Sequence, residues 1–179
     1  MPDRAMGVAA ALARVTSRAM FDFRPAPDTP KPEAYRQLCD AADALTAGEP
    51  DAVANMANVA ALLWDFLPDL NWAGFYRLVE DELVLGPFVG RPACIRIPLG
   101  KGVCGAAASA GRTQLVEDVH SFPGHIACDA VTRSELVVPV TREGAVVAVI
   151  DLDSPVAARF DRADAEGIEA LAAVLEKRI

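Results

Sequence analysis

Several features that would indicate a particular class of function are missing from the sequence. No apolar run approaches the ~20 residues that a membrane-spanning helix needs. The 17 basic residues form no cluster and the formal net charge is -8, which argues against binding to nucleic acid or to an anionic membrane surface. A small molecule that carries a positive group fits this charge better.

Cysteine is scarce, and its spacing excludes two common motifs. The four cysteines include no C-x-x-C pair, so neither a thioredoxin redox motif nor a zinc-ribbon knuckle is indicated. A chain of 179 residues with 53% hydrophobic residues can bury the core of one globular domain without disulfides. In such a chain we expect catalytic, metal-binding or reduced cysteines rather than a disulfide scaffold.

The first part of the chain divides into an extension and a helical region. Residues 24–30 are rich in proline, so residues 1–31 are expected to form a loosely ordered extension and residues 32–179 a single domain. The extension contains a short apolar run, residues 7–13, but Asp3 precedes it and Arg14 follows it, so we expect a cytoplasmic protein rather than a secreted one.

Helical spacing of apolar residues predicts a helix that begins at Pro32 and stops at Gly48, and a second from Val53 to Leu67, both covering a sheet. Cys39 lies on the apolar face of the first helix and is expected to be a small core residue. The predicted buried stripe of the second helix is Val53, Met56, Ala57, Ala60, Leu63, Trp64 and Leu67.

The rest of the chain reads mainly as strands. We predict a hairpin over residues 72–85, a strand at 95–98, a flexible glycine turn at 100–105, a short helix at 106–110, a strand at 113–116, a loop at 117–134, a hairpin over 136–150 and a closing helix capped by Asp161. Together these elements predict an α+β sandwich without internal repeats.

Three cysteines lie in or beside the turn-forming segments of this middle region. Cys94, Cys104 and Cys128 are surrounded by Gly, Pro, His and Asp, whereas a structural cysteine usually lies inside a helix or strand. This placement indicates chemistry, and the fold would have to bring the thiols together.

The final hairpin predicts a group of carboxylates. If its loop is residues 142–144, Glu135 lies opposite Asp151, and Asp153 follows on the same face. Like charges across a sheet repel unless a cation lies between them, so this face would suit an ammonium group. Either aspartate could also donate a proton if burial keeps it protonated. The alternative is that Asp151, Asp153 and Ser154 are only turn residues that end a strand.

The chain resembles the free methionine-(R)-sulfoxide reductases of GAF-domain fold. The resemblance covers about residues 33 to 179 and rests on the order and spacing of residues 71–76 (NWAGFY), 85–88 (LGPF), 100–105 (GKGVCG), 118–120 (DVH), 124–129 (GHIACD) and 151–154 (DLDS). It implies a single GAF-like domain, a six-stranded antiparallel sheet with helices packed against it, and a nearly closed cavity for free L-methionine-(R)-sulfoxide.

The same resemblance implies roles for individual residues. Cys128 would be the nucleophile, Cys94 the resolving thiol, and Cys104 a participant in disulfide exchange. Three carboxylates, those of Glu135, Asp151 and Asp153, would hold the substrate and supply a proton. Two aromatic residues, Trp72 and Tyr76, would wall the methyl and sulfur end of the substrate, although an aromatic residue at the start of a strand is also commonly core.

The implied reaction cycle uses thiols alone. The nucleophile would become a sulfenic acid and then a disulfide, which thioredoxin or a similar dithiol would reduce. No metal or other cofactor is expected, and the resemblance leaves a homodimer open.

Two other classes of function stay open at this point. A ligand-sensing GAF module without turnover is one, although a sensor has no need of three loop cysteines. A structural zinc site made by the three cysteines and one histidine is the other, with suitable ligand types but unusual spacing. The two loop histidines, His120 and His125, could lower the pKa of a cysteine or serve only as structural hydrogen-bonding residues.

Overall fold

The computed structural model describes residues 24–124 and 129–179 of the chain. Within these residues the elements follow the order α2 (Lys31–Thr46), α3 (Ala52–Phe66), β1 (Trp72–Val79), β2 (Glu82–Gly90), β3 (Arg96–Pro98), α4 (Gly102–Ala110), β4 (Gln114–Val116), a 3-10 turn (Val119–Ser121), β5 (Ser134–Arg142), β6 (Ala145–Ser154) and α5 (Arg162–Leu175). In the described part of the chain, no helix is both long and apolar enough to cross a bilayer.

One six-stranded sheet organises the molecule. Its strand order is β3-β2-β1-β6-β5-β4, and each neighbouring pair is antiparallel. The central pair, β1 and β6, is therefore flanked on both edges by other strands, and these two strands are rich in buried residues because helices pack on both faces of the sheet. The predicted α+β class and six-stranded antiparallel sheet are confirmed.

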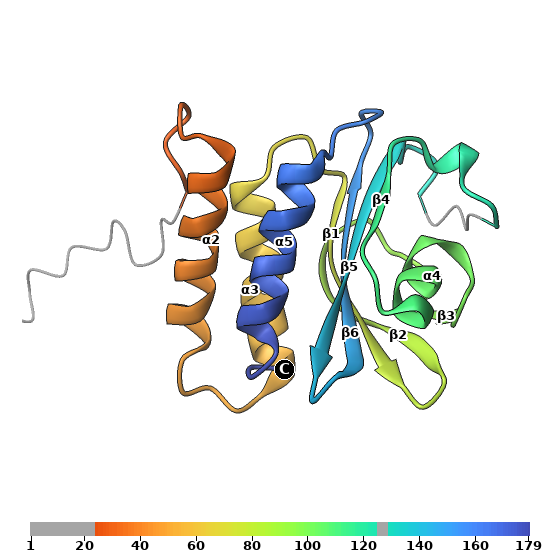
Figure 1. Ribbon diagram of the computed structural model, residues 1–179, viewed down its shortest axis with the longest axis horizontal. Helices are drawn as coiled ribbons and strands as arrows, with labels where there is room; N and C mark the ends of the chain where they lie inside the picture. The colour runs from red at the N-terminus through yellow and green to blue at the C-terminus, as the bar shows by residue number, and fades with distance from the viewer. Residues whose placement is uncertain (1–23, 125–128) are drawn as a thin grey trace, which may run out of the picture.

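Helices cover both faces of this sheet, but not as predicted (Figure 1). The first face carries α3 and α5, and the other carries α4. The prediction that the first helix covers the sheet directly is wrong, because α2 packs on α3 and α5 as an outer layer. Close contact fixes this position: a Cβ at Gly167 would lie 2.2 Å from the Tyr35 ring, and the Tyr35 hydroxyl donates to Asp164 Oδ1 at 2.7 Å.

The buried face of α3 also differs from the predicted stripe. Val53 and Trp64 are 48% and 39% exposed, and the buried residues are Asn55, Met56, Val59, Ala60, Leu62, Leu63 and Phe66. The reason is that α3 lies between the sheet and α2, so it buries a face wider than one stripe. Asn55 is tolerated there because its Nδ2 donates to the carbonyl oxygens of Glu49 and Arg178.

Side-chain alternation along the strands divides the core into two parts. In β1, Ala73 and Phe75 face α3 and α5, whereas Trp72 and Tyr76 belong to the second cluster, which includes α4 residues. The same alternation places the adjacent residues Val138 and Val137 of β5 on opposite faces of the sheet, Val138 in the first cluster and Val137 in the second. The candidate site therefore lies on the α4 side of the sheet.

The helices begin and end mostly where local chemistry predicts. Asp161 caps α5 as predicted, forming a reciprocal capping box with Asp164. One boundary prediction is wrong: α4 begins at Gly102, so Cys104 and Gly105 lie inside a helix rather than in a flexible turn. A Cβ at Gly105 would lie 2.5 Å from the Pro98 carbonyl oxygen, so this glycine allows α4 to approach β3 rather than giving flexibility.

The register of the final hairpin contains two deviations from prediction. Arg142 pairs with Ala145 around a two-residue turn, Glu143 and Gly144, whose positive φ values of 53° and 80° suit a type I′ hairpin. A bulge at residue 147 then adds one residue to β6. The predicted pairing of Glu135 with Asp151 is wrong, because Glu135 lies opposite Asp153 and Val137 opposite Asp151.

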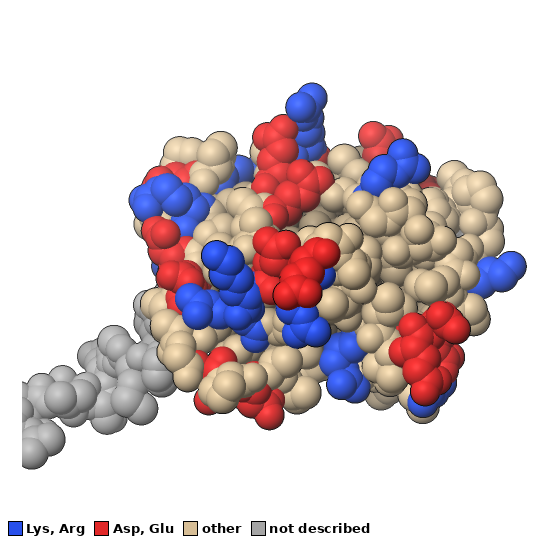
Figure 2. Space-filling model, turned by 60° about the horizontal axis from the view of Figure 1, so that its bottom comes forward, with Lys and Arg blue, Asp and Glu red and all other residues tan. Residues whose placement is uncertain are grey.

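The surface carries charges of both signs. Figure 2 shows acidic and basic side chains interspersed on one face of the molecule. Ion pairs link residues far apart in the sequence, such as Arg178 with Asp43 and Lys31 with Asp161. Residues 24–30 lie against the domain at one point at least, since Arg24 pairs with Asp65 of α3 at 2.7 Å.

Candidate active site

A cavity opens between α4 and the strands β1, β5 and β6. Six of the predicted site residues line it: Trp72, Tyr76, Cys104, Glu135, Asp151 and Asp153. They come from four different elements, so the cavity exists only in the folded domain. Two basic residues, Arg91 and Lys101, also line it and are themselves exposed.

Three carboxylates share this cavity because of strand pairing. Glu135 lies opposite Asp153 in the β5–β6 ladder, and Asp151 follows two residues before Asp153 on the same face of β6. The pairings of β1 place Trp72 opposite Asp153 and Gly74 opposite Asp151. The three carboxylates thus share one face of the sheet as predicted, although the predicted pairing of Glu135 with Asp151 is wrong.

Burial changes the acid–base behaviour of these groups. Glu135 and Asp151 are 7% and 5% exposed, and Asp153 is partly buried. Burial raises the pKa of Asp151 to about 7, and burial with the Asp151 and Asp153 charges holds the pKa of Glu135 well above its usual range. The pKa of Asp153 is raised as well, by burial and then by Asp151 and Asp129. The cavity therefore keeps protons on carboxyl groups near neutral pH unless a cation enters.

Cys104 lies beside the carboxylates. Its Sγ is 3.8 Å from Glu135 Oε1. The Sγ atom, one Glu135 oxygen and one Asp151 oxygen all lie within 4.8 Å of one another. Burial, followed by the charges of Asp151 and Glu135, raises the pKa of the Cys104 thiol well above its ordinary value. Cys104 is therefore a protonated thiol near neutral pH and a poor nucleophile in this state.

An aromatic wall borders the carboxylates. The Trp72 ring stacks on the Tyr76 and Phe88 rings, with centroid separations of 5.8 Å and 5.2 Å. The Trp72 Nε1 donates to the carbonyl of Arg91 at 3.2 Å, so the buried indole has its polar group satisfied. Trp72 is 2% exposed and lines the cavity, so it is both a buried core residue and part of the cavity wall.

The other cysteines occupy three different situations. Cys94 lies beside the cavity, where the Tyr76 hydroxyl donates to its carbonyl oxygen at 3.0 Å, and it is disulfide-bonded. Cys39 is a free thiol on α2, half-buried against the main core as predicted. The predicted nucleophile, Cys128, lies outside the described residues.

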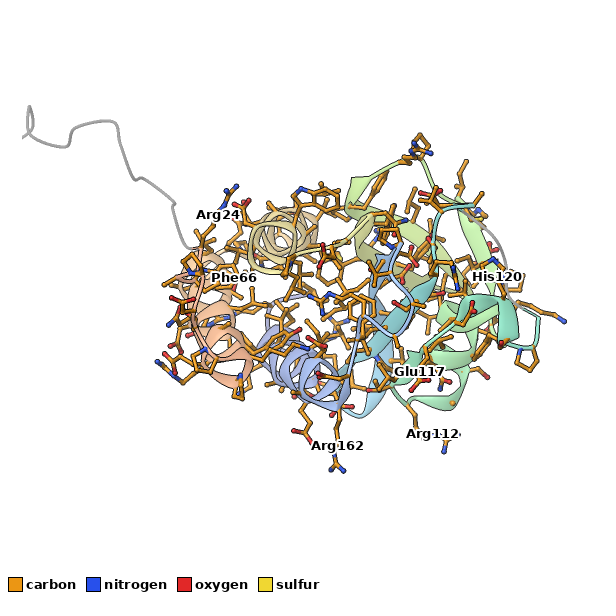
Figure 3. All side chains as sticks on the ribbon, turned by 90° about the horizontal axis from the view of Figure 1, so that it is seen from above. Arg24, Phe66, Arg112, Glu117, His120 and Arg162 are labelled. Atoms are coloured by element: carbon orange, nitrogen blue, oxygen red, sulfur yellow. The ribbon has the colours of Figure 1, made fainter. Side chains whose placement is uncertain are left out.

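Of the two histidines, the structure describes His120, which lies outside the candidate site. His120 lies on the α4 side of the sheet in the loop after β4 (Figure 3), and its Nδ1 contacts Asp118 Oδ1 at 2.7 Å. Its side chain is 61% exposed and it does not line the cavity, which favours the structural interpretation. His125 lies outside the described residues.

Three polar residues near the cavity were not predicted to be functional. Asn71 Nδ2 donates to Asp129 Oδ2 at 3.2 Å and to Thr132 Oγ1 at 2.9 Å, and both acceptors line the cavity. Asn71 thus fastens the loop before β5 to the start of β1. Asn71 and Asp129 belong to the recognised motifs, which was a usable signal, whereas nothing in the sequence distinguishes Thr132 from a loop residue.

Comparisons with known proteins agree with this architecture. A family model for the GAF domain matches residues 51–177. The free methionine-R-sulfoxide reductase of Escherichia coli is 50% identical over 147 residues, which cover 82% of this chain and 89% of that protein, and the yeast (Saccharomyces cerevisiae) protein of the same name is 44% identical over 155 residues, covering 82% and 86%. The X-ray structure of the free methionine-R-sulfoxide reductase from Neisseria meningitidis in complex with its substrate aligns with a TM-score of 0.80 at 45% identity, covering 84% of this chain and 90% of that one.

Proposed function

Since the chain belongs to the GAF-domain family of free methionine-R-sulfoxide reductases, we propose that it reduces free L-methionine-(R)-sulfoxide to methionine. One observation carries the proposal beyond the family resemblance. A cavity with three clustered carboxyl groups on one side and stacked aromatic rings on the other suits a small molecule with an ammonium group and an apolar sulfur-bearing end.

Charge explains why the substrate should be a free amino acid. Glu135, Asp151 and Asp153 repel one another when ionised, and an ammonium group among them would relieve this repulsion. A peptide-bound methionine has an amide nitrogen instead, which brings no charge and would leave the buried carboxylates unpaired. The aromatic wall of Trp72 and Tyr76 would contact the methyl and sulfur end.

The first chemical step needs a thiolate and an acid. We assign attack on the sulfoxide sulfur to Cys128, as the family resemblance implies, and this agrees with Cys104 being held as a protonated thiol. One ammonium group among three carboxyl groups leaves a proton on at least one of them, and Asp151, whose pKa burial raises to about 7, would donate this proton to the sulfoxide oxygen. Methionine would leave, and Cys128 would hold the oxygen as a sulfenic acid.

The second step restores the enzyme. The Cys94 thiol would condense with the sulfenic acid on Cys128, forming a disulfide and releasing water. Thioredoxin or a similar dithiol would then reduce that disulfide, either directly or after exchange with Cys104. Such a cycle requires a reducing compartment, and we therefore place the enzyme in the cytoplasm.

Single-turnover measurements on cysteine variants test this assignment. Without an external reductant, reduced Cys94→Ser should release up to one methionine per chain and then stop, whereas Cys128→Ser should release none. Cys39→Ser is the matched control, because Cys39 lies on α2, outside the cavity, and should behave as the wild type. Methionine release by Cys128→Ser with loss of release in Cys94→Ser would reverse the two roles. Tight binding of the sulfoxide without any release by wild-type protein would favour the sensing module instead.

A further inference from the structure

Three potential metal ligands meet in the cavity. Cys104 Sγ, a Glu135 oxygen and an Asp151 oxygen lie within 4.8 Å of one another, and all three residues are buried. They come from α4, β5 and β6, so their approach depends on packing of the helix against the sheet rather than on local sequence.

A second observation is that one oxygen atom of this cluster lacks a hydrogen-bond donor in the part of the chain that the structure describes. Asp151 is 5% exposed, and its Oδ1 atom is buried without a hydrogen-bond donor among the described residues. A buried carboxylate oxygen with no donor is unfavourable, because the hydrogen bonds that it made to water are not replaced. The side chains of Cys104 and Glu135 both interact with Asp151, yet its Oδ1 atom still has no donor in the described structure.

We propose that Cys104, Glu135 and Asp151 form a binding site for a thiophilic divalent cation, of which Zn²⁺ is the physiological example. The donor set is one sulfur and two carboxylate oxygens, which suits Zn²⁺, whereas Mg²⁺ prefers six oxygen ligands. Zinc lies about 2.3 Å from sulfur and about 2.0–2.2 Å from oxygen, so tetrahedral donors are roughly 3.5 Å apart. The Cys104 Sγ to Glu135 Oε1 distance of 3.8 Å is close to this value.

The site predicts inhibition of the enzyme. Binding requires the Cys104 thiol, and any protonated carboxyl of Glu135 or Asp151, to release a proton to the solvent, and no group is oxidised or reduced. The metal would occupy the place that we assign to the substrate ammonium, a step that rests on the proposed function. A cation bound there would also hold Cys104 away from disulfide exchange, so substrate and metal should exclude one another.

Cobalt absorption gives a readout that does not depend on activity. Co²⁺ replaces Zn²⁺ in tetrahedral sites, and a thiolate ligand adds a charge-transfer band in the near ultraviolet. Full-length protein is titrated with Co²⁺ without added reductant, the state in which Cys94 is disulfide-bonded and Cys39 and Cys104 are the free thiols of the described residues. We expect a band at one Co²⁺ per chain, its loss in Cys104→Ala, and its retention in Cys39→Ser.

Two further measurements complete the test. Asp151→Asn should weaken Co²⁺ binding at least tenfold while keeping the band at saturation, and circular dichroism should show that each variant is folded. Free methionine, which carries the ammonium group, should displace Co²⁺ competitively. A missing band in folded wild-type protein, or a band that survives Cys104→Ala, would overturn the proposal. Binding of Co²⁺ with no competition from methionine would contradict the claim that the metal inhibits the enzyme. Reductase activity is measured separately, so failure of the metal site and failure of the proposed function can be told apart.

Discussion

Replacing Asp151 with asparagine should stabilise the protein, and more so at higher pH. The wild-type carboxyl has an ordinary pKa of 3.8 and a folded-state pKa of about 7, because burial disfavours its charged form. Between these values the folded protein binds more protons than the unfolded chain, so the free energy of unfolding falls as pH rises. Asp151 therefore costs no stability below about pH 4, and its cost grows until about pH 7. The asparagine side chain cannot ionise, and its amide can donate to the neighbouring carboxylate of Glu135, so the variant avoids this loss.

The size of the effect follows from the same two values. The interval between 3.8 and about 7, at 1.36 kcal/mol for each pH unit, corresponds to about 4 kcal/mol as the largest cost of ionising Asp151. For a domain of this size 1 kcal/mol shifts the melting temperature by about 2–4 °C, so the variant should melt up to roughly 8–16 °C higher than wild type at pH 8. Because Glu135 and Asp153 lie in the same cavity and also hold protons there, we expect a gain of several degrees from Asp151 alone.

Differential scanning calorimetry from pH 5 to pH 8 measures this directly. The difference in melting temperature between Asp151→Asn and wild type should grow with pH and level off above pH 7. Asp81→Asn, at an exposed aspartate in the β1–β2 turn, is the control and should show a small difference that does not change with pH. A variant that is less stable than wild type at every pH, or a difference that shrinks as pH rises, would refute the argument that burial of this carboxylate is unfavourable.

Three other substitutions test separate parts of the account. Tyr76→Phe removes the donor to the Cys94 carbonyl, so in stopped-flow measurements disulfide formation should slow more than methionine release; equal slowing would contradict this role. Gly105→Ala places a Cβ 2.5 Å from the Pro98 carbonyl oxygen, and the forced shift of α4 should cost about 1–3 kcal/mol in denaturant unfolding, whereas an unchanged midpoint would show that α4 has room. Asp161→Ala removes the cap of α5 and should lower stability by about 1 kcal/mol with kcat and KM unchanged, since Asp161 lies outside the cavity; altered kinetic constants would refute that separation.

The carboxylate face shows how far strand periodicity can be relied on. The predicted hairpin loop was one residue too long, and a bulge at residue 147 was not foreseen. Each error alone would have moved Glu135 to the opposite face relative to Asp151 and Asp153, but together they shift the register by two residues. Because side chains alternate with a period of two, the shared face was predicted correctly while the facing partner of Glu135 was not. Bulges depend on the packing of both strands, so local sequence patterns locate them poorly.

Helix packing limited the prediction in a different way. The glycines around Cys104 suggested a flexible turn, yet Gly105 is required by the close approach of α4 to Pro98. A glycine that provides space and a glycine that provides flexibility look alike in sequence. The contact of Cys104 with Glu135 and the link from Asn71 to Thr132 join residues 31 and 61 positions apart, and no local pattern specifies either contact.

The most direct test of the central claim compares free L-methionine-(R)-sulfoxide with its N-acetylated form, using excess dithiol reductant and purified wild-type protein. We predict a kcat/KM for the acetylated compound about 5- to 150-fold lower, because an uncharged amide leaves the buried carboxylates of the cavity without a cation, a loss of about 1–3 kcal/mol. The (S) epimer of the free sulfoxide serves as the second comparison and should be a poor substrate. Equal kcat/KM values for the free and acetylated (R)-sulfoxides would contradict the claim that this cavity recognises a free amino acid through its charge.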